Sequence, residues 1–330
     1  MSKTLVIIPH YNKLALLKEC IDYLNCQNYD DFDVIIVDNG STDGSIDYIS
    51  NLTNENKRFH KILFNENMGF AYAVNKGIKY SIENDYTYSI LLNNDAYVKS
   101  DFVENIVNAI ESRKNAFAIS SLMLSYKNPD TIDSFGDYYT ILGWPYQGHV
   151  ALNVDSIEAD EEVFSACGGA SIYKNSILKK IGLFDEKFFA YLEDIDISYR
   201  AKIHGYSVFT CKDAVCYHLG SATSGSKYNS FKVRTSARNN VFLIYKNMPL
   251  LQMLINLIPI AFGSFVKFLF FLFKGFGFDY LFGTIDGIKN IGMIDRTDFS
   301  NASIFTYISI EIELIINTFK YILNFIKRHS

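Results

Sequence analysis

The chain has 330 residues, of which 49% are hydrophobic, and its formal net charge is -5. This length allows one large domain with an appendage or two modest domains, and the negative charge argues against a general nucleic-acid-binding protein. The five cysteines form no CxxC pair, which predicts free thiols in a reducing compartment. The N-terminal run MSKTLVIIPHYN lacks the apolar stretch of a signal peptide, so we expect the N-terminal part to stay in the cytoplasm.

Short β-branched apolar runs alternate with segments of helical spacing through the N-terminal third of the chain. The pattern predicts strands over residues 4–8, 34–37, 61–64 and 88–92, and helices over residues 13–24, 45–52 and 69–82. Strands that alternate with helices at this pace imply an α/β fold, in which helices flank a mostly parallel sheet with right-handed crossovers.

Polar residues follow three of these strands at the point where each strand ends. The three clusters are Pro9-His10-Tyr11-Asn12, Asp38-Asn39-Gly40 and Asn93-Asn94-Asp95. Open α/β sheets bind ligands at the carboxyl ends of their strands, so the clusters predict a binding site at that edge. Asp38 is placed to accept from a nucleobase or a ribose, although a turn or helix-capping role is the alternative. Asp95 is placed to hold a hard divalent ion, although an Asn/Asp turn is the alternative.

The strongest stretch runs from Phe184 to Arg200, where aromatic residues lead into paired carboxylates at the start of a helix that begins near Glu193. Glu193 or Asp194 is suited to act as general base toward a sugar hydroxyl, and helix capping is the alternative. Arg200 is a candidate phosphate or acceptor contact, but its i,i+4 spacing from Asp196 also fits an ion pair on the helix.

Residues 122–159 are rich in Tyr, Asp and Gly, and we interpret them as a variable insertion with short strands. The run CGGA, with Gly168 and Gly169, allows a close backbone approach to a ligand or a helix. His218 follows a predicted strand over residues 214–217, and an imidazole there suits Mn²⁺ beside Asp95, with an ordinary structural histidine as the alternative.

Eight motifs in order give the chain its resemblance to a known family. They are VIIPHYN, VDNGSTDGS, NENMGFAYAVNKGI, LLNNDA, CGGA, FFAYLEDIDISYRAKIHGY, YHLGSAT and ARNNVFLIYKNMP. Together they resemble glycosyltransferase family 2 with its GT-A fold, over roughly residues 3–250, and look closest to a bacterial branch that contains rhamnosyltransferases of cell-surface polysaccharide synthesis. The resemblance departs from the family at Asn93, where the family's Asp-x-Asp motif begins with an acid.

The resemblance implies roles for individual residues. It implies a nucleotide-sugar site made by Pro9, Tyr11, Asn12, Asp38, Asn65, Gly69, Asn75, Asn93, Asn94, Gly168 and Gly169. Asp95 and His218 would hold a divalent metal, Mg²⁺ or Mn²⁺. Asp194 would be the catalytic base, with Glu193 as the neighbouring candidate, and Arg238 would lie near a phosphate. Such an enzyme inverts the anomeric centre in one displacement and needs no enzyme nucleophile.

The resemblance also implies substrates. We expect a nucleotide-diphosphate sugar donor, best dTDP-rhamnose and otherwise a UDP-hexose, and a lipid-linked saccharide acceptor in O-antigen, capsule or other polysaccharide synthesis. A sugar-nucleotide pyrophosphorylase would need a Gly-rich basic loop after the first strand, which is absent, and a glycoside hydrolase would not explain Asp38 and Asp95. A non-catalytic scaffold that binds nucleotide sugar at a membrane remains the alternative.

The C-terminal part differs in composition from the rest. No Asp or Glu occurs from Ala214 to Phe278, and residues 248–273 are strongly apolar apart from breaks such as Pro259 and Lys267. This segment could span a membrane, lie in the interface, or pack as a soluble helical subdomain. Residues 304–326 form a further predicted helix.

We therefore expect three parts and a membrane location. A GT-A catalytic domain would cover residues 1–225, with a nucleotide-binding half at 1–98 and an acceptor half at 99–225, and a helical membrane-associating region would cover 226–330. The enzyme would lie peripherally, or shallowly inserted, at the cytoplasmic face of the inner membrane, and a homodimer is possible.

Overall fold

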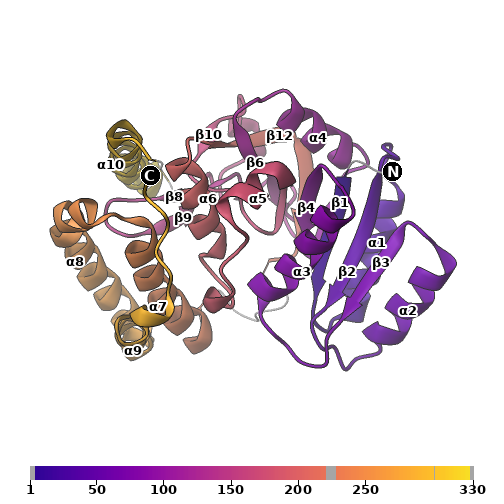
Figure 1. Ribbon diagram of the computed structural model, residues 1–330, viewed down its shortest axis with the longest axis horizontal. Coiled ribbons are helices and arrows are strands. Elements are labelled where there is room, and N and C mark those ends of the chain that lie inside the picture. Colours follow the sequence, from indigo (N-terminus) through magenta and orange to yellow (C-terminus); the bar gives the residue numbers. More distant parts are fainter. Residues whose placement is uncertain (1–3, 221–227, 301, 328–330) are drawn as a thin grey trace.

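The computed structural model describes residues 4–220, 228–300 and 302–327, and it places a ten-stranded sheet between two layers of helices (Figure 1). The sheet order is β10-β12-β6-β11-β4-β1-β2-β3, with β5 added beside β12 and β7 beside β6. Pairs among β1 to β4 are parallel, as is β12 with β6, whereas β11 runs antiparallel between β4 and β6. This confirms the predicted α/β class with a mostly parallel sheet.

The N-terminal elements follow the predicted order. They are β1 (Thr4–His10), α1 (Leu14–Asn25), β2 (Phe32–Asp38), α2 (Ser45–Glu55), β3 (Phe59–Leu63), α3 (Phe70–Glu83), β4 (Tyr88–Leu92) and β5 (Ala96–Val98). The predicted ends differ from the observed ends by at most three residues, because each strand is a short apolar run and each helix carries a clear apolar face.

The middle of the chain completes the sheet and adds short strands beside it. Its elements are α4 (Phe102–Glu111), β6 (Ala116–Ser125), β7 (Ile132–Ser134), β8 (Asp137–Tyr139), β9 (Pro145–Gln147), β10 (Glu162–Val163), β11 (Ala170–Lys174), α5 (Asn175–Ile181), α6 (Glu193–Ile203) and β12 (Ser207–His218). The predicted insertion at 122–159 therefore begins too early. Leu122 to Ser125 belong to the central strand β6, which is buried on both faces and so lacks the alternating pattern that marks a strand.

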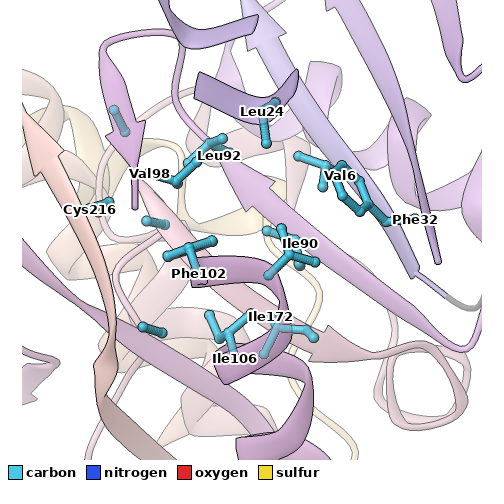
Figure 2. Packing of buried hydrophobic residues seen from close by; sticks show 14 of the residues in the cluster. Val6, Leu24, Phe32, Ile90, Leu92, Val98, Phe102, Ile106, Ile172 and Cys216 are labelled. Carbon is cyan, nitrogen blue, oxygen red and sulfur yellow. The ribbon is translucent and has the colours of Figure 1, made fainter. Parts of the chain in front are cut away.

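Side chains of the parallel strands alternate between two cores. Val6 and Ile8 point to the face that α1 and α4 cover, together with Ile90, Phe102 and Cys216 (Figure 2). Their neighbours Leu5 and Ile7 point to the other face, beneath α3 and α5. Gly77 on α3 lies so close to β1 that a Cβ there would come within 2.3 Å of Ile7. Helices on both faces thus bury the parallel strands and leave their carboxyl ends open.

Four helices form the end of the molecule opposite to α2 and β3 (Figure 1). They are α7 (Ser230–Asn247), α8 (Leu250–Phe273), α9 (Gly277–Lys289) and α10 (Ile304–Lys327). Tyr199 and Ile203 of α6 share one buried cluster with Phe242, Ile310 and Leu314, so these helices pack on the sheet-containing part of the chain through a common core. The predicted boundary at residues 225 and 226, like the SAT of the motif YHLGSAT, lies outside the described residues.

The helix α8 continues through Pro259 and is, among the described residues, the one helix long and apolar enough to cross a membrane. Much of its surface and of the surfaces of α9 and α10 is exposed and apolar, with Ile258, Phe262, Phe273 and Phe305 between 60% and 88% exposed.

Candidate active site

A cavity of about 1400 Å³ opens at the carboxyl edge of the parallel strands and extends to the C-terminal helices. Many of the predicted site residues line it together: Pro9, Tyr11, Gly69, Asn93, Asn94, Asp95, Gly168, Gly169, Glu193, Asp194 and His218. Segments far apart in the sequence therefore meet where the strand ends predicted a site. The volume exceeds the ~300–1,000 Å³ typical of a site for one small ligand.

Loops after β1 and β2 form one wall of the cavity and brace each other. Asn12 lies behind this wall, where its N–H donates to Ser41 Oγ at 2.7 Å and its Oδ1 accepts from the Thr42 N–H at 2.9 Å. Asn39 lines the cavity and donates to Gly69 O at 3.1 Å and Asn67 Oδ1 at 3.0 Å. These hydrogen bonds link the loops to one another and hold them at fixed positions.

Asp38 lies directly behind this wall. It is fully buried, and its Oδ2 accepts from the Ser41 N–H at 2.9 Å. Within the part of the chain that the structure describes, its Oδ1 has no hydrogen-bond partner. A buried carboxylate oxygen left in this way is costly unless a ligand donor reaches it.

His10 is a buried residue between two of these loops. Its ring nitrogens contact Ser45 Oγ and Asn94 Nδ2, each at 2.8 Å. Burial lowers the pKa of His10, outweighing the carboxylates of Asp38 and Asp43 that raise it. The ring is therefore neutral and orients the Asn94 amide at the cavity edge.

Asp95 and His218 meet on neighbouring strands, since β5 and β12 pair Ala96 with His218. His218 Nε2 lies 3.3 Å from Asp95 Oδ1, and His218 Nδ1 lies 2.7 Å from Asp133 Oδ2. Burial lowers the pKa of His218, but the hydrogen bonds to the two carboxylates outweigh it and raise the pKa to about 9.

This donor set fits a hard divalent ion. A carboxylate and an imidazole converge on one point of the cavity, and no group of three or more His, Cys, Asp or Glu suited to a metal exists among the described residues. Mg²⁺ and Mn²⁺ commonly take one or two protein ligands and complete their shell with substrate phosphates and water. Asn93 also faces the cavity but offers only an amide.

The loop before α6 presents Glu193 and Asp194 in a strained conformation. Phe189, Tyr191 and Leu192 all have positive φ angles of 63°, 72° and 69°, which non-glycine residues seldom adopt. Gly69 is needed opposite this loop, because a Cβ there would lie 2.6 Å from the Phe189 ring. The strain is localised at the residues that lead into the two carboxylates.

Asn239 of α7 holds this loop from behind. Its Nδ2 donates to the carbonyl oxygens of Phe188, Ala190 and Tyr191 at 2.9, 2.9 and 2.7 Å. Its Oδ1 accepts from Arg238, whose guanidinium also donates to Phe188 O at 3.0 Å. The Arg-Asn pair of α7 thus fixes the loop.

Glu193 is buried and Asp194 is half-buried, and both line the cavity. Burial raises the pKa of Asp194, while hydrogen bonds from the N–H groups of Ile195 and Gly168 offset part of this effect. Burial and the nearby Asp194 charge raise the pKa of Glu193 to about 8. The same two causes hold the pKa of Asp137 well above its usual range. The N–H groups of Ile195 and Gly168 favour the ionised form of Asp194, which suits this carboxyl to the role of base.

Two predicted contact residues do not line the cavity, because their side chains bond to groups in the protein interior. Arg200 is 5% exposed, pairs with Asp196 at 3.0 Å, and donates to the carbonyls of Ile181 and Leu183, which leaves no donor for a phosphate. Asn75 is 2% exposed and bonds the backbone of Phe184, away from the cavity.

Besides Asn12 and Asp38, which lie behind the cavity wall, two further predicted residues are not among those that line the cavity. Asn65 is exposed but is not among the cavity residues, and the neighbouring Asn67 takes that place. Arg238 does not line the cavity either, because its guanidinium caps the loop at Phe188. The motifs located the right loops, but the sequence did not tell which polar residue of each loop faces inward.

Other cavity residues carried weak or no signals in the sequence. Asp133 comes from the short strand β7, in a stretch with no clear periodicity. Lys267 was visible only as a break in an apolar run, and the helix α8 directs it into the cavity. The acid-free composition around Lys267 was the one signal that marked this region as unusual.

Comparison with known proteins agrees with this architecture. The family model for glycosyl transferase family 2 matches residues 5–182, more than half of the chain. Glycosyltransferase GlyA of Streptococcus pneumoniae is 28% identical over 186 residues, covering 56% of this chain and 25% of GlyA. Poly-beta-1,6-N-acetyl-D-glucosamine synthase of Staphylococcus aureus is 23% identical over 223 residues, covering 66% of this chain and 50% of the synthase. The matches thus span a quarter to a half of these relatives.

Solved structures share the fold. A mannosyltransferase from Pyrobaculum calidifontis, in complex with GDP-Man and Mn²⁺, superposes with a TM-score of 0.55 at 15% identity and covers 89% of this chain and 76% of its own. TarS of S. aureus in complex with UDP-GlcNAc gives 0.52 at 16% identity, over 79% of this chain and 69% of its own. These similarities confirm the predicted GT-A fold. With the family match over more than half its length, the chain belongs to glycosyltransferase family 2.

Proposed function

We propose that this glycosyltransferase moves a sugar from a nucleotide-diphosphate donor to a hydroxyl group, with inversion and with a divalent metal. The observation that carries this proposal is that one cavity holds both the Asp95–His218 pair and the carboxyls of Glu193 and Asp194. The first pair suits a diphosphate with its metal, and the second suits a hydroxyl that must lose a proton.

The donor lies along the loops after β1, β2 and β4 in this proposal. Pro9, Tyr11, Asn93 and Asn94 contact it, and the unpartnered Oδ1 of Asp38 accepts from the base or ribose. Asp95 and His218 would hold Mg²⁺ or Mn²⁺, which when bound would neutralise the charge that develops on the leaving diphosphate. The two solved structures above contain GDP-Man with Mn²⁺ and UDP-GlcNAc, which supports a donor of this class.

Asp194 takes the proton from the attacking hydroxyl. Its raised pKa brings it nearer to neutrality than a free carboxylate, which makes it a better base. The N–H groups of Gly168 and Ile195 hold it in place, and Gly168 and Gly169 keep the facing wall free of side chains. Attack from the face opposite to the diphosphate inverts the anomeric carbon in one step, so positioning and charge supply the acceleration.

The substrates follow from the relatives and the C-terminal helices. We propose dTDP-rhamnose as the donor, with a UDP-hexose as the alternative, and a lipid-linked saccharide as the acceptor in cell-surface polysaccharide synthesis. One relative is named for teichuronic acid biosynthesis, TuaG of Bacillus subtilis, 28% identical over 130 residues that cover 39% of this chain and 50% of its own. The exposed apolar surfaces of α8, α9 and α10 support a location on the cytoplasmic face of a membrane.

A donor screen followed by one substitution tests the proposal. Nucleotide sugars are first screened by thermal shift with Mg²⁺ or Mn²⁺, and the product is checked for anomeric inversion. We then expect Asp194→Asn to reduce turnover by a factor of at least ~10², the lower range for a lost general base, while donor binding stays unchanged. Normal turnover in Asp194→Asn would refute the base assignment. Donor binding without any transfer by the unaltered protein would instead favour a nucleotide-sugar-binding scaffold.

A further inference from the structure

One face of α8 is polar and docks onto the rest of the protein. Gln252, Asn256, Gly263 and Lys267 recur at intervals of four or seven residues, which places them on the same side of the helix. Gln252 and Asn256 both donate to Glu311 Oε2 on α10, at 2.8 and 2.9 Å. The side of α8 that carries Gln252, Asn256 and Gly263 therefore faces the rest of the protein. Lys267 lies on the same side, one turn further along, and lines the cavity.

The turn before Lys267 is locked to the loop that follows β8. Trp144 Nε1 donates to Gly263 O at 3.0 Å, and a Cβ on Gly263 would come within 2.3 Å of Leu142 O. The ammonium of Lys267 lies 6.0 Å from the centre of the Trp144 ring. Since the helix and the loop are in direct contact here, the position of Lys267 is fixed.

Lys267 is a cation without an anion. Throughout residues 4–220, 228–300 and 302–327, no carboxylate pairs with it, and burial lowers its pKa to about 8. An ammonium taken out of water without a counter-charge is costly. An anion that enters the cavity would remove that cost.

The position of Lys267 indicates which substrate brings the anion. Phe271 and Tyr280 line the same part of the cavity, and both belong to the helices at the apolar end of the molecule. On the outer side of α8, Phe262 and Phe265 are 60% and 58% exposed. Lys267 therefore stands between a surface suited to lipid and the cavity that holds Asp194. The donor diphosphate already has its own place at the strand ends.

We propose that Lys267 binds a phosphate of the acceptor, the phosphate that joins the acceptor sugar to its lipid. This proposal rests on the proposed function. When the phosphate is bound to Lys267, the lipid chain extends along the apolar side of α8 and the sugar extends toward Asp194. The cavity, larger than one small ligand requires, has room for both substrates.

Binding of geranyl diphosphate to the whole protein, measured by calorimetry in the presence of EDTA, tests this site. EDTA removes divalent ions that would hold the diphosphate at Asp95. We expect Lys267→Met to weaken binding by roughly tenfold or more, as for loss of a charge-assisted contact in a desolvated site. Lys274→Met is the matched control, because this lysine ends the same helix but is exposed and outside the cavity. It should bind like the unaltered protein.

Further readouts decide between a substrate site and other roles. Lys267→Met should unfold at the same temperature as the unaltered protein or higher, because it removes a half-buried charge that no carboxylate of the described residues pairs with. Lys267→Arg should retain binding. Unchanged binding in Lys267→Met, or equal loss in both methionine variants, would overturn the proposal. The proposal would also be overturned if Lys267→Met still bound geranyl diphosphate but no longer sedimented with phosphatidylglycerol vesicles. Lys267 would then contact a lipid headgroup instead of the acceptor phosphate.

The proposed function can fail separately. If the protein transfers no sugar but Lys267→Met loses geranyl diphosphate, the anion site stands without the reaction. If it transfers sugar and Lys267→Met raises the KM of the donor and not that of a lipid-linked acceptor, the reaction stands and this site assignment is wrong.

Discussion

At the scale of single residues, the cavity and its walls combine several features that cost folding free energy. Three non-glycine residues before Glu193 have positive φ, each at a cost of ~1–3 kcal/mol, and the surrounding hydrogen bonds from Asn239 hold them there. Asp38 and Glu193 each bury a carboxyl oxygen that lacks a partner among the described residues. Strain and unpaired polar atoms of this kind gather where binding and catalysis take place.

A substitution at Asp133 tests the metal assignment without changing either proposed metal ligand, Asp95 or His218. Asp133 Oδ2 lies 2.7 Å from His218 Nδ1, so it would keep a proton on that nitrogen when a metal beside Asp95 displaces the proton of Nε2. We expect Asp133→Asn to weaken Mn²⁺ binding by ~10–100-fold, as found for such outer partners of metal-binding histidines. Titration with Mn²⁺ followed by electron paramagnetic resonance measures this directly. Asp130→Asn, at an exposed position nearby, should bind Mn²⁺ normally, and equal affinity in both variants would contradict the assignment.

Glu193 makes stability depend on pH in an unusual direction. Its pKa rises from 4.5 in the unfolded chain to about 8 in the folded protein, so the folded protein holds a proton that the unfolded chain has lost. Its contribution is therefore fully present below pH 4.5 and is lost progressively as the pH rises to about 8. We expect Glu193→Gln to stabilise the protein at pH 8 by up to a few kcal/mol, since one pKa unit corresponds to about 1.4 kcal/mol. Urea unfolding across this pH range measures the change, and a variant with an unaltered pH slope would contradict it.

At the scale of elements, a buried network of charged and amide side chains joins α6 to α7. The i,i+4 spacing of Asp196 and Arg200 predicted only the part of it that lies within α6. Asp196 is fully buried and pairs with Arg200 of its own helix, as its spacing predicts. It also lies 3.2 Å from Lys246 Nζ and accepts from Asn247 Nδ2 at 2.8 Å, both on α7. Burial raises the pKa of Asp196, but Arg200 and Lys246 outweigh it and lower the pKa.

Removing this carboxylate should separate the two helices. We expect Asp196→Asn to destabilise the protein by ~3–5 kcal/mol, because two buried cations lose a shared counter-charge. Asp286→Asn is the control, since Asp286 pairs with Arg234 at 2.6 Å on the surface, where such a pair contributes ~0–1 kcal/mol. Urea unfolding compares the two variants. Similar losses in both would mean that the buried network adds no more than a surface ion pair.

The elements that could be predicted from sequence are those whose pattern is local. Residues 4–92 carry alternating short strands and amphipathic helices, and there the expected and observed elements agree. The strand β6 and the antiparallel β11 were not predicted, since both are buried on two faces and their pairing depends on distant strands. Asp95 and His218 could be proposed as partners from their ligand chemistry and from the family resemblance, and the pairing of β5 with β12 brings them together. Asp133 and Lys267 required the fold itself, because β7 and α8 bring them to the cavity from unpatterned and apolar segments.

At the scale of the whole molecule, polar and apolar functions lie at different ends. The carboxyl edge of the sheet carries the acids and amides, and α8, α9 and α10 carry most of the large exposed apolar residues (Figure 1). The inner stripe of α8 is tied to Glu311 and to Trp144, so this helix is held along its length against the protein. A helix tied down in this way presents one apolar side, which favours lying in a membrane interface over crossing it.

Vesicle binding should therefore depend on the outer side of α8. Ile258, Phe262 and Phe273 are 80%, 60% and 88% exposed, so replacing all three with asparagine should leave the fold and its unfolding temperature unchanged. Burial of each such side chain contributes ~1.5–3 kcal/mol, so the triple variant should lose sedimentation with phosphatidylglycerol vesicles by at least tenfold. Leu63→Asn combined with Tyr126→Asn removes exposed apolar side chains remote from these helices and should sediment normally. If the triple variant still sediments but changes from dimer to monomer in size-exclusion chromatography, a second copy of the chain covers this surface.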